Sequence, residues 1–325
     1  MTVRLAISAG DPAGVGPEVS VRALASVALE APPLLFGDAA DLGPRLAALG
    51  LADRVELIDV GRCDPEVVRR HEDHAASGLI ALASLDGAID AVRAGRAAAV
   101  VTAPVSKAAI TLCGQPFVGQ TEHLARRAGL ADDDVTMMFL GPRLSVSLVT
   151  THLSIRAVPD AITAERVRRA TVHLAEALVA LEAAHGASIT VSGLNPHAGE
   201  HGLFGDEETR VIAPVLASLR GLSPFVEGRL ALAGPQPAEA AFRMAQAAVH
   251  AGVVAMFHDQ ATIASKLLDW GSAVNVTWGL PFVRTSVDHG VAFDAARSGR
   301  IDPEGMIAAV ELGARLARGR RGGGA

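Results

Sequence analysis

The sequence contains no tyrosine, and aromatic residues make up only 3% of it. Half of the residues are hydrophobic, so the core has to be built mainly from alanine, valine, leucine and isoleucine. This composition argues against an aromatic-rich β-sandwich and favours an α/β fold, in which helices cover a parallel sheet. With 325 residues the chain exceeds the size at which a single core grows efficiently, so one large unit or two lobes with a cleft are expected.

The sequence also has few cysteines and no excess of positive charge. Cys63 and Cys113 are the only cysteines and lack CxxC spacing, which argues against a disulfide framework or a cysteine metal site. We expect two buried free thiols instead. The formal net charge of −6 gives no general attraction to phosphate backbones, so no nucleic-acid partner is expected.

Long apolar runs are missing too. The start, MTVRLAISAGDPAG, lacks the apolar core of a secretory signal, and no run reaches the ~20 residues of a membrane span. A cytoplasmic protein without a membrane partner is expected. The chain ends in ARGRRGGGA, and we expect residues 319–325 to form a flexible tail.

Short apolar runs alternate with segments of helical periodicity, which is the pattern of βαβ units. Thr163–His185 places apolar residues at helical spacing and predicts an amphipathic helix. No repeat or linker divides the chain, so residues 1–318 are expected to form a single catalytic unit of two intertwined α/β lobes. Five apolar runs are predicted strands: Arg4–Gly10, Ala97–Ala103, Leu144–Thr151, Ser188–Gly193 and Val253–His258.

Polar or glycine-rich motifs follow these strands, namely GDPAGVGPE, TAPVSK, THLS, GLNPHAGEHG and HDQ. In open α/β sheets, ligands bind outside the carboxyl ends of the strands, so the motifs are expected to share one site. Gly10–Glu18 is either an anion-binding turn or a tight turn from strand to helix. It does not match the dinucleotide fingerprint, because Val19 occupies the third glycine position.

Three histidines lie at or just past predicted strand ends: His152, His197 and His258. Neutral imidazole is the commonest metal ligand in proteins, although each of these side chains alone has a structural alternative. Asp259 adjoins His258 and is a candidate to orient it. A second group is Lys266, Asn275 and Arg284, whose side chains suit a phosphate or carboxylate, with ordinary surface charges as the alternative.

Taken together, the blocks GDPAGVGPE, VTAPVSKAAI, FVGQTEHLA, VTTHLSIR, GLNPHAGE, MFHDQ and VNVTWGLPFVRTSVDHG resemble the 4-hydroxythreonine-4-phosphate dehydrogenase family of pyridoxal phosphate biosynthesis. The resemblance covers nearly the whole chain. It implies a two-lobed α/β/α architecture similar to that of isocitrate and isopropylmalate dehydrogenases. It also implies a homodimer whose active site lies in the cleft and at the dimer interface, shared between the subunits.

The family's site residues map onto this sequence one by one. The resemblance implies that a divalent metal is held by three histidines, namely His152, His197 and His258. It implies substrate binding at five positions: Gln120, Thr121, Lys266, Asn275 and Arg284. Zinc is the first expectation for the metal, with cobalt, nickel, manganese or magnesium as alternatives. Lys107 in TAPVSK receives no assigned role.

The implied reaction is the NAD- or NADP-linked oxidation of 4-phosphohydroxy-L-threonine to a β-keto acid, which decarboxylates to 3-amino-2-oxopropyl phosphate. One alternative is a dehydrogenase of a related substrate, such as erythronate or threonate 4-phosphate or a cyclic dihydrodiol carboxylate. Another is a non-catalytic metal- and ligand-binding protein. The sequence leaves the choice between NAD and NADP open.

Two departures from the family pattern are consistent with a substrate other than 4-phosphohydroxy-L-threonine. Gln120 stands where the family usually has histidine, so a substrate-contacting imidazole is replaced by an amide. Glu239 and Ala240 stand where the family usually has aspartate and threonine. His123 lies three positions after Gln120, and on a helix it could supply the missing imidazole from one turn away.

Overall fold

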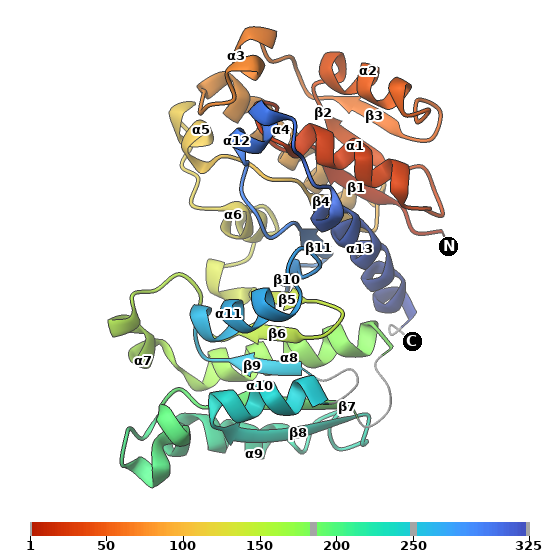
Figure 1. The fold of residues 1–325 in the computed structure, drawn as a ribbon. Helices are drawn as coiled ribbons and strands as arrows, with labels where there is room; N and C mark the ends of the chain where they lie inside the picture. The colour runs from red at the N-terminus through yellow and green to blue at the C-terminus, as the bar shows by residue number, and fades with distance from the viewer. Residues whose placement is uncertain (1, 183–186, 248–251, 323–325) are drawn as a thin grey trace. The chain divides into compact units, whose positions relative to one another are not determined.

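The computed structural model describes residues 2–182, 187–247 and 252–322 (Figure 1). The chain divides into two compact units: unit 1 comprises residues 1–135 and 274–321, and unit 2 comprises the intervening residues 136–273. Because unit 1 takes its strands from both sides of unit 2 in the sequence, the chain passes from one unit into the other and back.

Unit 1 contains a sheet with the strand order β3-β2-β1-β4-β11-β10. Neighbouring strands are parallel, except that β10 is antiparallel to β11. The strands are β1 (Leu5–Ser8), β2 (Leu34–Gly37), β3 (Glu56–Asp59), β4 (Ala99–Thr102), β10 (Val274–Trp278) and β11 (Val283–Ser286). The helices are α1 (Gly16–Ser26), α2 (Ala39–Ala48), α3 (Pro65–Arg70), α4 (Ala75–Arg93), α5 (Lys107–Leu112), α6 (Gln120–Arg127), α12 (Phe293–Ser298) and α13 (Glu304–Gly322), with a short turn η1 (Asp132–Asp134).

Helices cover both faces of this sheet. On one face, Leu85 and Ile89 of α4 pack against Val100 of β4 in a fully buried cluster. The next residue on β4, Val101, points to the opposite face, where Gly313 of α13 approaches it closely. A parallel sheet with both faces covered fits the expected α/β class.

Unit 2 contains a second run of strands in the order β5-β6-β9-β7-β8. β5 and β6 form an antiparallel pair, whereas the pairs β6–β9, β9–β7 and β7–β8 are parallel. The strands are β5 (Thr136–Leu140), β6 (Ser145–Leu148), β7 (Ala187–Ser192), β8 (Leu230–Gln236) and β9 (Gly252–Ala255). The helices are α7 (Val158–Ala161), α8 (Ala164–Ala180), α9 (Ala213–Leu219), α10 (Ala238–Ala247) and α11 (His258–Leu268), with the turns η2 (Ile155–Ala157), η3 (Pro196–Gly202) and η4 (Glu208–Ile212).

Unit 2 is also built in three layers. Ala241 of α10 and Ala261 of α11 pack with Val253 on one face of the sheet. Leu174 of α8 approaches Gly252 on the other face. Each unit therefore has the α/β/α layering that the sequence predicts.

The five predicted strands are confirmed as β1, β4, β6, β7 and β9. The predicted helix Thr163–His185 is confirmed as the shorter α8, and residues 183–186 lie outside the described part of the chain. Thr163 caps this helix, because its side chain accepts a hydrogen bond from the Arg166 amide at 3.3 Å. Residues 319–322 of the expected tail belong to α13, and residues 323–325 are not described.

Among the residues that the structure describes, one helix, α4, is long and apolar enough by length and composition to cross a membrane. Half of its most apolar window is buried inside the protein, and Leu85, Ala88 and Ile89 belong to the unit 1 core. The apolar composition of α4 is therefore that of a core helix.

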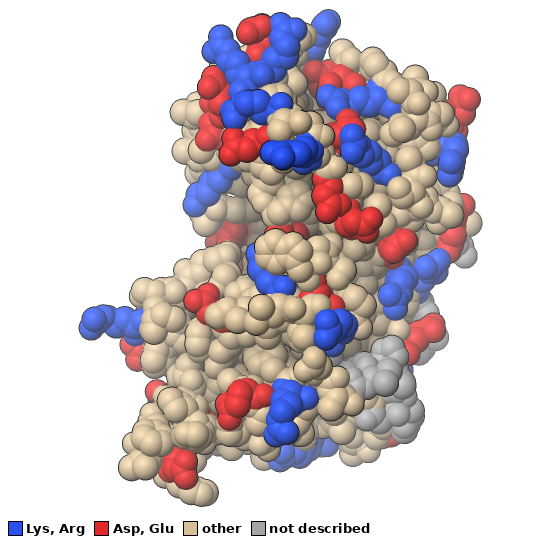
Figure 2. Space-filling view, viewed as in Figure 1, with Lys and Arg blue, Asp and Glu red and all other residues tan. Residues whose placement is uncertain are grey.

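On the viewed face of the molecule, acidic and basic side chains are intermixed (Figure 2).

The expectation of two buried free thiols is right for Cys63 and wrong for Cys113. Cys63 is buried, and burial raises the pKa of its thiol to about 11. Cys113 is only half-buried, and its Sγ donates a hydrogen bond to the Ile110 carbonyl at 2.8 Å. The thiol of Cys63 therefore stays protonated at neutral pH, which makes it unreactive.

Candidate functional site

The three predicted histidine ligands follow three adjacent strands of unit 2. β9 lies between β6 and β7 in the sheet and is parallel to both. His152 follows β6, His258 begins α11 after β9, and His197 follows β7. Since parallel strands end at the same edge of a sheet, tertiary structure brings all three histidines to one edge.

His152 and His258 form the closest pair among them, with ring centroids 5.5 Å apart. His258 Nδ1 is hydrogen-bonded to Asp259 Oδ1 at 2.8 Å, so the candidate orienting carboxylate does contact it. The contact is possible because both residues lie in the first turn of α11 instead of in an extended strand. With Nδ1 engaged, Nε2 of His258 is the nitrogen left to bind a metal.

His197 lies in a left-handed turn. Its φ is 53°, and the positive φ values continue through Ala198, Gly199, Glu200 and His201. For a residue other than glycine, this conformation costs roughly 1–2 kcal/mol. Such strain persists only where surrounding contacts determine the backbone, and it is concentrated at functional sites.

The three histidines do not form one cluster within a single chain. Across the described ranges, no group of three or more His, Cys, Asp or Glu side chains is close enough to hold a metal ion. The ring of His197 lies 6.2 Å from that of Phe204. The His152–His258 pair, in which Asp259 orients His258, suits a nitrogen-preferring metal but supplies only part of a ligand set.

Arg284 of β11 is the centre of the candidate anion site in unit 1. Its side chain is buried, with 3% of the residue exposed. Nε and Nη2 donate to Thr102 Oγ1 at 3.2 and 2.9 Å, and Nη1 donates to Thr277 Oγ1 at 3.0 Å. Burial lowers the pKa of Arg284 to about 10, although the charge of Glu122 opposes this shift. The hydrogen-bond partners that the structure gives this cation are all neutral.

Gln120 begins α6, and its side chain contacts Arg284. Gln120 Oε1 accepts from Arg284 Nη2 at 3.1 Å, and Gln120 Nε2 donates to the Ala103 carbonyl at 3.2 Å. Thr121 is the next residue of the same first turn and is half-buried. The amide that replaces the family's imidazole is therefore bonded to the predicted anion-binding arginine.

His123 does not take the place of the missing imidazole. Its Nε2 is paired with Asp86 Oδ1 at 2.7 Å, and its ring packs on Phe117 with centroids 5.6 Å apart. Both contacts are internal to unit 1. His123 does lie on a helix, α6, as the hypothesis of a substitute imidazole required, but its side chain is bound to Asp86 and Phe117.

The other two predicted substrate residues lie in different units. Asn275 on β10 belongs to unit 1, and its Oδ1 is buried without a hydrogen-bond partner in the described chain. Lys266 on α11 belongs to unit 2, where its Nζ lies 6.0 Å from the ring centroid of Trp270. Lys107 is exposed at the start of α5.

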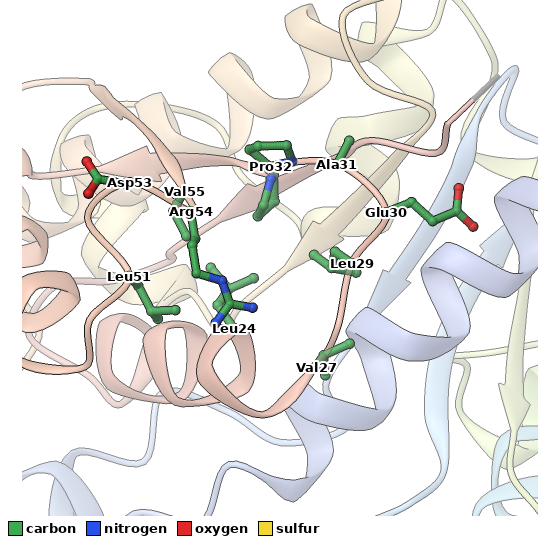
Figure 3. A pocket seen from close by; sticks show the side chains of 11 residues that line it. Leu24, Val27, Leu29, Glu30, Ala31, Pro32, Leu51, Asp53, Arg54 and Val55 are labelled. Atoms are coloured by element: carbon green, nitrogen blue, oxygen red, sulfur yellow. The ribbon is translucent and has the colours of Figure 1, made fainter.

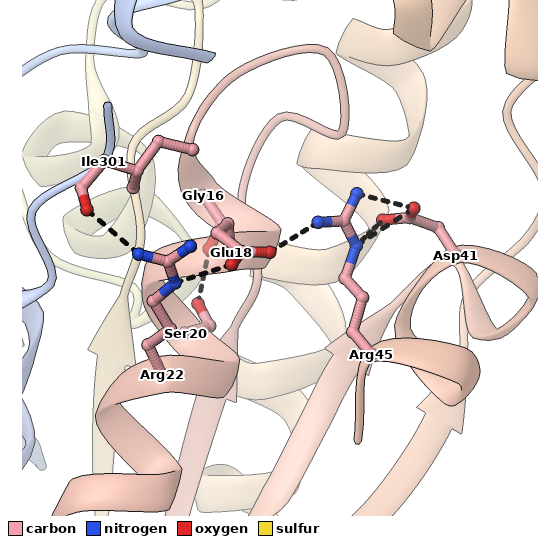
Figure 4. Close-up of polar contacts among 7 residues, drawn as sticks. All are labelled: Gly16, Glu18, Ser20, Arg22, Asp41, Arg45 and Ile301. Atoms are coloured by element: carbon pink, nitrogen blue, oxygen red, sulfur yellow. Dashed lines mark hydrogen bonds and ion pairs between the residues drawn. The ribbon is translucent and has the colours of Figure 1, made fainter. Parts of the chain in front are cut away.

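The glycine-rich turn after β1 is a packing feature. A Cβ on Gly10 would lie 2.2 Å from the Pro104 carbonyl oxygen, and one on Gly16 would lie 2.3 Å from that of Ala9. These glycines allow backbone segments to approach each other, which supports the tight-turn interpretation. Glu18 at the end of the motif binds Arg22 and Arg45 at 2.6 Å each (Figure 4).

Asp11, inside this turn, is a buried acid that no sequence motif predicted as a site residue. Its Oδ1 accepts from the Ala13 amide at 2.9 Å, but Oδ2 has no partner in the described chain. Burial raises the pKa of Asp11 to about 6, and the charge of Asp73 adds to the increase. The sequence offered one signal for Asp11, because an aspartate directly after a predicted strand lies at the edge of the sheet where ligands bind. The burial of Asp11 is decided by tertiary structure.

Unit 1 contains a cavity of about 180 Å³ (Figure 3). Leu24, Val27, Leu29 and Leu51 contribute apolar walls, with Arg54 nearby. None of the predicted metal or substrate residues lines it. The candidate site therefore rests on the histidine pair and on the surroundings of Arg284.

Comparison with known proteins adds independent evidence. The profile of the family described as pyridoxal phosphate biosynthetic protein PdxA matches residues 28–313. A 4-hydroxythreonine-4-phosphate dehydrogenase from Chromobacterium violaceum is 43% identical, with 98% of each sequence covered. A D-threonate 4-phosphate dehydrogenase from Salmonella typhimurium is 35% identical, covering 97% of this chain and 99% of the relative. The crystal structure of a 4-hydroxythreonine-4-phosphate dehydrogenase from Klebsiella pneumoniae is 35% identical and has a TM-score of 0.83, covering 98% of this chain and 99% of that chain.

Proposed function

The chain belongs to the pyridoxal phosphate biosynthetic protein PdxA family, and on that premise we propose that it oxidises the secondary alcohol of 4-phosphohydroxy-L-threonine. The product is a β-keto acid that decarboxylates to 3-amino-2-oxopropyl phosphate. NAD or NADP supplies the hydride acceptor. The observation that carries the proposal is the buried Arg284, whose protein partners are neutral groups and which is therefore suited to an anionic substrate.

The anionic end of the substrate binds in unit 1 in this proposal. Arg284 offers a planar fork of donors, and Thr102 and Thr277 hold that fork in place. Asn275 adds an amide oxygen that is still without a partner in the described chain, which suits a substrate donor group. Thr121 and Lys266 complete the proposed substrate contacts.

His152, His197 and His258 are the proposed metal ligands. Asp259 holds His258 in one tautomer through Nδ1, which leaves Nε2 available. Zinc fits three imidazoles and a substrate oxygen, and when bound it would supply Lewis-acid stabilisation of charge on the alcohol oxygen. Activity should therefore be lost after treatment with a chelator and should return when zinc or cobalt is added.

A cytoplasmic homodimer completes this proposal. The segments that follow the histidines expose apolar side chains, including Phe204, Leu267 and Trp270, and Trp270 is 80% exposed. Exposed apolar side chains near a site are typical of a surface that another chain covers. The incomplete ligand set within one chain agrees with a site to which a second subunit contributes.

The decisive test is formation of reduced cofactor from 4-phosphohydroxy-L-threonine by the purified, zinc-loaded protein, compared with the unphosphorylated parent. We expect turnover of the phosphorylated compound only. Absence of turnover on every phosphorylated hydroxy acid in a panel would support the alternative of a non-catalytic binding protein.

D-Threonate 4-phosphate is the second candidate substrate, because a relative of that name is 35% identical and Gln120 replaces the family's usual histidine. A protonated histidine would add a charge-assisted donor near Arg284, which Gln120 cannot provide. If threonate 4-phosphate is preferred by the wild type, Gln120→His should shift the ratio of kcat/KM toward 4-phosphohydroxy-L-threonine by about tenfold. An unchanged ratio near pH 6.5 would exclude position 120 as the discriminating residue.

A further inference from the structure

Glu208 is a buried carboxylate in unit 2 that no part of the proposed reaction uses. It begins the short helical segment η4, and only 2% of the residue is exposed. In the part of the chain that the structure describes, no lysine or arginine forms an ion pair with it. A buried carboxylate without a cation needs several hydrogen-bond donors to be tolerated.

Those donors come from the segment that leads into His197. Glu208 Oε1 accepts from the backbone amides of Leu194 and Asn195, both at 2.8 Å. Glu208 Oε2 accepts from Asn195 Nδ2 at 3.0 Å. Two successive amides converge on one carboxylate oxygen, so this carboxylate helps to determine the direction in which the chain enters the turn.

The turn also closes around the carboxylate sterically. A Cβ on Gly199 would lie 2.8 Å from Glu208 Oε2, and one on Gly193 would lie 3.0 Å from Oε1. Both glycines therefore allow the backbone on either side of His197 to pass next to the Glu208 side chain. Contacts of this kind can maintain the left-handed backbone of His197.

Gln260 connects the same segment to the strand end that carries His258. Its Nε2 donates to the Gly193 carbonyl at 3.1 Å, and its Oε1 accepts from the Met256 amide at 2.8 Å. The start of the His197 segment is therefore bonded to the segment before His258. Glu208 and Gln260 therefore both bind the segment that leads into His197.

We propose that Glu208 is a positioning residue that fixes His197 for metal binding by holding the Leu194–Asn195 amides and the left-handed turn. The inference rests on the proposed function, because it concerns one of the proposed metal ligands. Glu208 acts through His197 and does not itself contact the metal or the substrate.

Glu208→Gln is the most direct variant, because it keeps the shape of the side chain and removes its charge. Asn195 Nδ2 already donates to both Glu207 Oε2 and Glu208 Oε2, so a glutamine amide nitrogen facing it would place two donors together. Glu207→Gln is the matched control, since Glu207 also binds Asn195 but is only half-buried and does not contact the backbone amides.

Zinc and cobalt affinities of the full chain are measured by calorimetric titration, with the metal alone as the probe. We expect Glu208→Gln to weaken binding by tenfold or more and Glu207→Gln by less than threefold. His197→Ala should weaken binding strongly, and adding Glu208→Gln to it should cause no further loss, because Glu208 acts through His197. Wild-type affinity in Glu208→Gln, or losses that add in the double variant, would overturn the proposal.

Amide hydrogen exchange supplies a readout that does not need the metal. In Glu208→Gln the amides of Leu194 and Asn195 should exchange at least tenfold faster than in the wild type, while the midpoint of denaturant unfolding shifts little. Unchanged exchange at both amides would contradict the role of Glu208, whether or not the wild type binds metal. Failure of the wild type to bind zinc or cobalt would instead refute the proposed function. If Glu208→Gln does not fold, Glu208→Asp keeps the charge on a shorter side chain and is expected to show the same two losses more weakly.

Discussion

At the scale of single residues, Arg284 and Asp11 are two buried ionisable groups that form no ion pair with a side chain to which they are hydrogen-bonded. The guanidinium of Arg284 is held by Thr102, Thr277 and Gln120, which leaves its positive charge unneutralised by its bonded neighbours. Asp11 has one carboxylate oxygen without a partner in the described chain. Burial shifts the pKa of each group, and shifted pKa values are concentrated at functional sites, so both residues are suitable for mutational tests.

Arg284→Lys should lower kcat/KM for the phosphorylated substrate by roughly tenfold to a hundredfold, the equivalent of one charge-assisted contact. A lysine keeps the charge, but its single nitrogen cannot bind two threonines, Gln120 and an anion together. Steady-state kinetics on the phosphorylated compound provide the measurement, and zinc affinity serves as the control that should not change. Equal kcat/KM values for variant and wild type would show that Arg284 does not bind the anion.

Asp11 should make folding less favourable as pH rises. Burial raises its pKa to about 6, whereas the unfolded chain has the ordinary aspartate value near 4. The unfolded chain therefore releases its proton first, and the Asp11 contribution to stability falls between about pH 4 and pH 6, by at most on the order of 3 kcal/mol.

Asp11→Asn should remove this fall and leave the variant more stable than the wild type above pH 6. Denaturant unfolding at pH 4.5 and pH 7.5 measures the difference between the two proteins, because other titrating groups cancel in the comparison. A difference that is the same at both pH values would mean that Asp11 does not titrate in this window.

At the scale of secondary-structure elements, side-chain contacts decide how neighbouring segments are joined. Glu18 of α1 binds Arg45 of α2, and Arg45 also binds Asp41 at 2.9 Å within its own helix (Figure 4). Burial would raise the pKa of Glu18, but the hydrogen bonds and charges of Arg22 and Arg45 outweigh it and lower the pKa. The ionised carboxylate is therefore the form that joins the two helices.

Glu18→Gln should lower the free energy of unfolding by about 1 kcal/mol at neutral pH, because the three side chains form a partly buried network. Since the folded pKa is lowered, this contribution is complete above the ordinary carboxyl pKa and is lost as pH falls through the folded value. Urea unfolding of both proteins at pH 7 and pH 3 tests this. A loss that persists at pH 3 would indicate a packing effect instead of an ionic one.

At the scale of the whole molecule, the arrangement of strands determines which residues one chain can supply to the site. His152 and His258 follow adjacent strands of the same unit, and their rings lie 5.5 Å apart. His197 follows the next strand but does not join them in a cluster in the described chain. These positions allow the proposed sharing between subunits to be tested with pairs of inactive variants.

If His197 is supplied by the partner subunit, mixing His152→Ala with His197→Ala should restore activity to roughly a quarter of the wild-type level, because half of the dimers are hybrids and each has one intact site. Mixing His152→Ala with His258→Ala should restore nothing, because each site takes both of these residues from one chain. Turnover by mixed proteins after subunit exchange is the measurement. Inactivity of both mixtures, with hybrid dimers demonstrated, would place all three ligands in one chain.

The sequence by itself determined the α/β class, five of the strands, the helix α8 and the membership of a family. Local periodicity and ordered motifs carry this information, because both depend on neighbouring residues in the chain. Other strands were not predicted from the sequence, including β3, whose side chains are exposed or half-buried, and β10 and β11, which are buried although they contain polar side chains such as Asn275 and Arg284. Such strands become regular only through pairing with their neighbours.

Tertiary structure alone decided which polar residues are buried and which contact each other. The sequence could nominate Gln120 and Arg284 separately, but only the sheet brings Gln120 Oε1 to Arg284 Nη2. It gave no indication that Glu208 and Asp11 are buried, because an acidic residue in a loop is usually solvated. The physical reason is that burial and hydrogen bonding join segments far apart in the chain, and the fold determines where those segments meet.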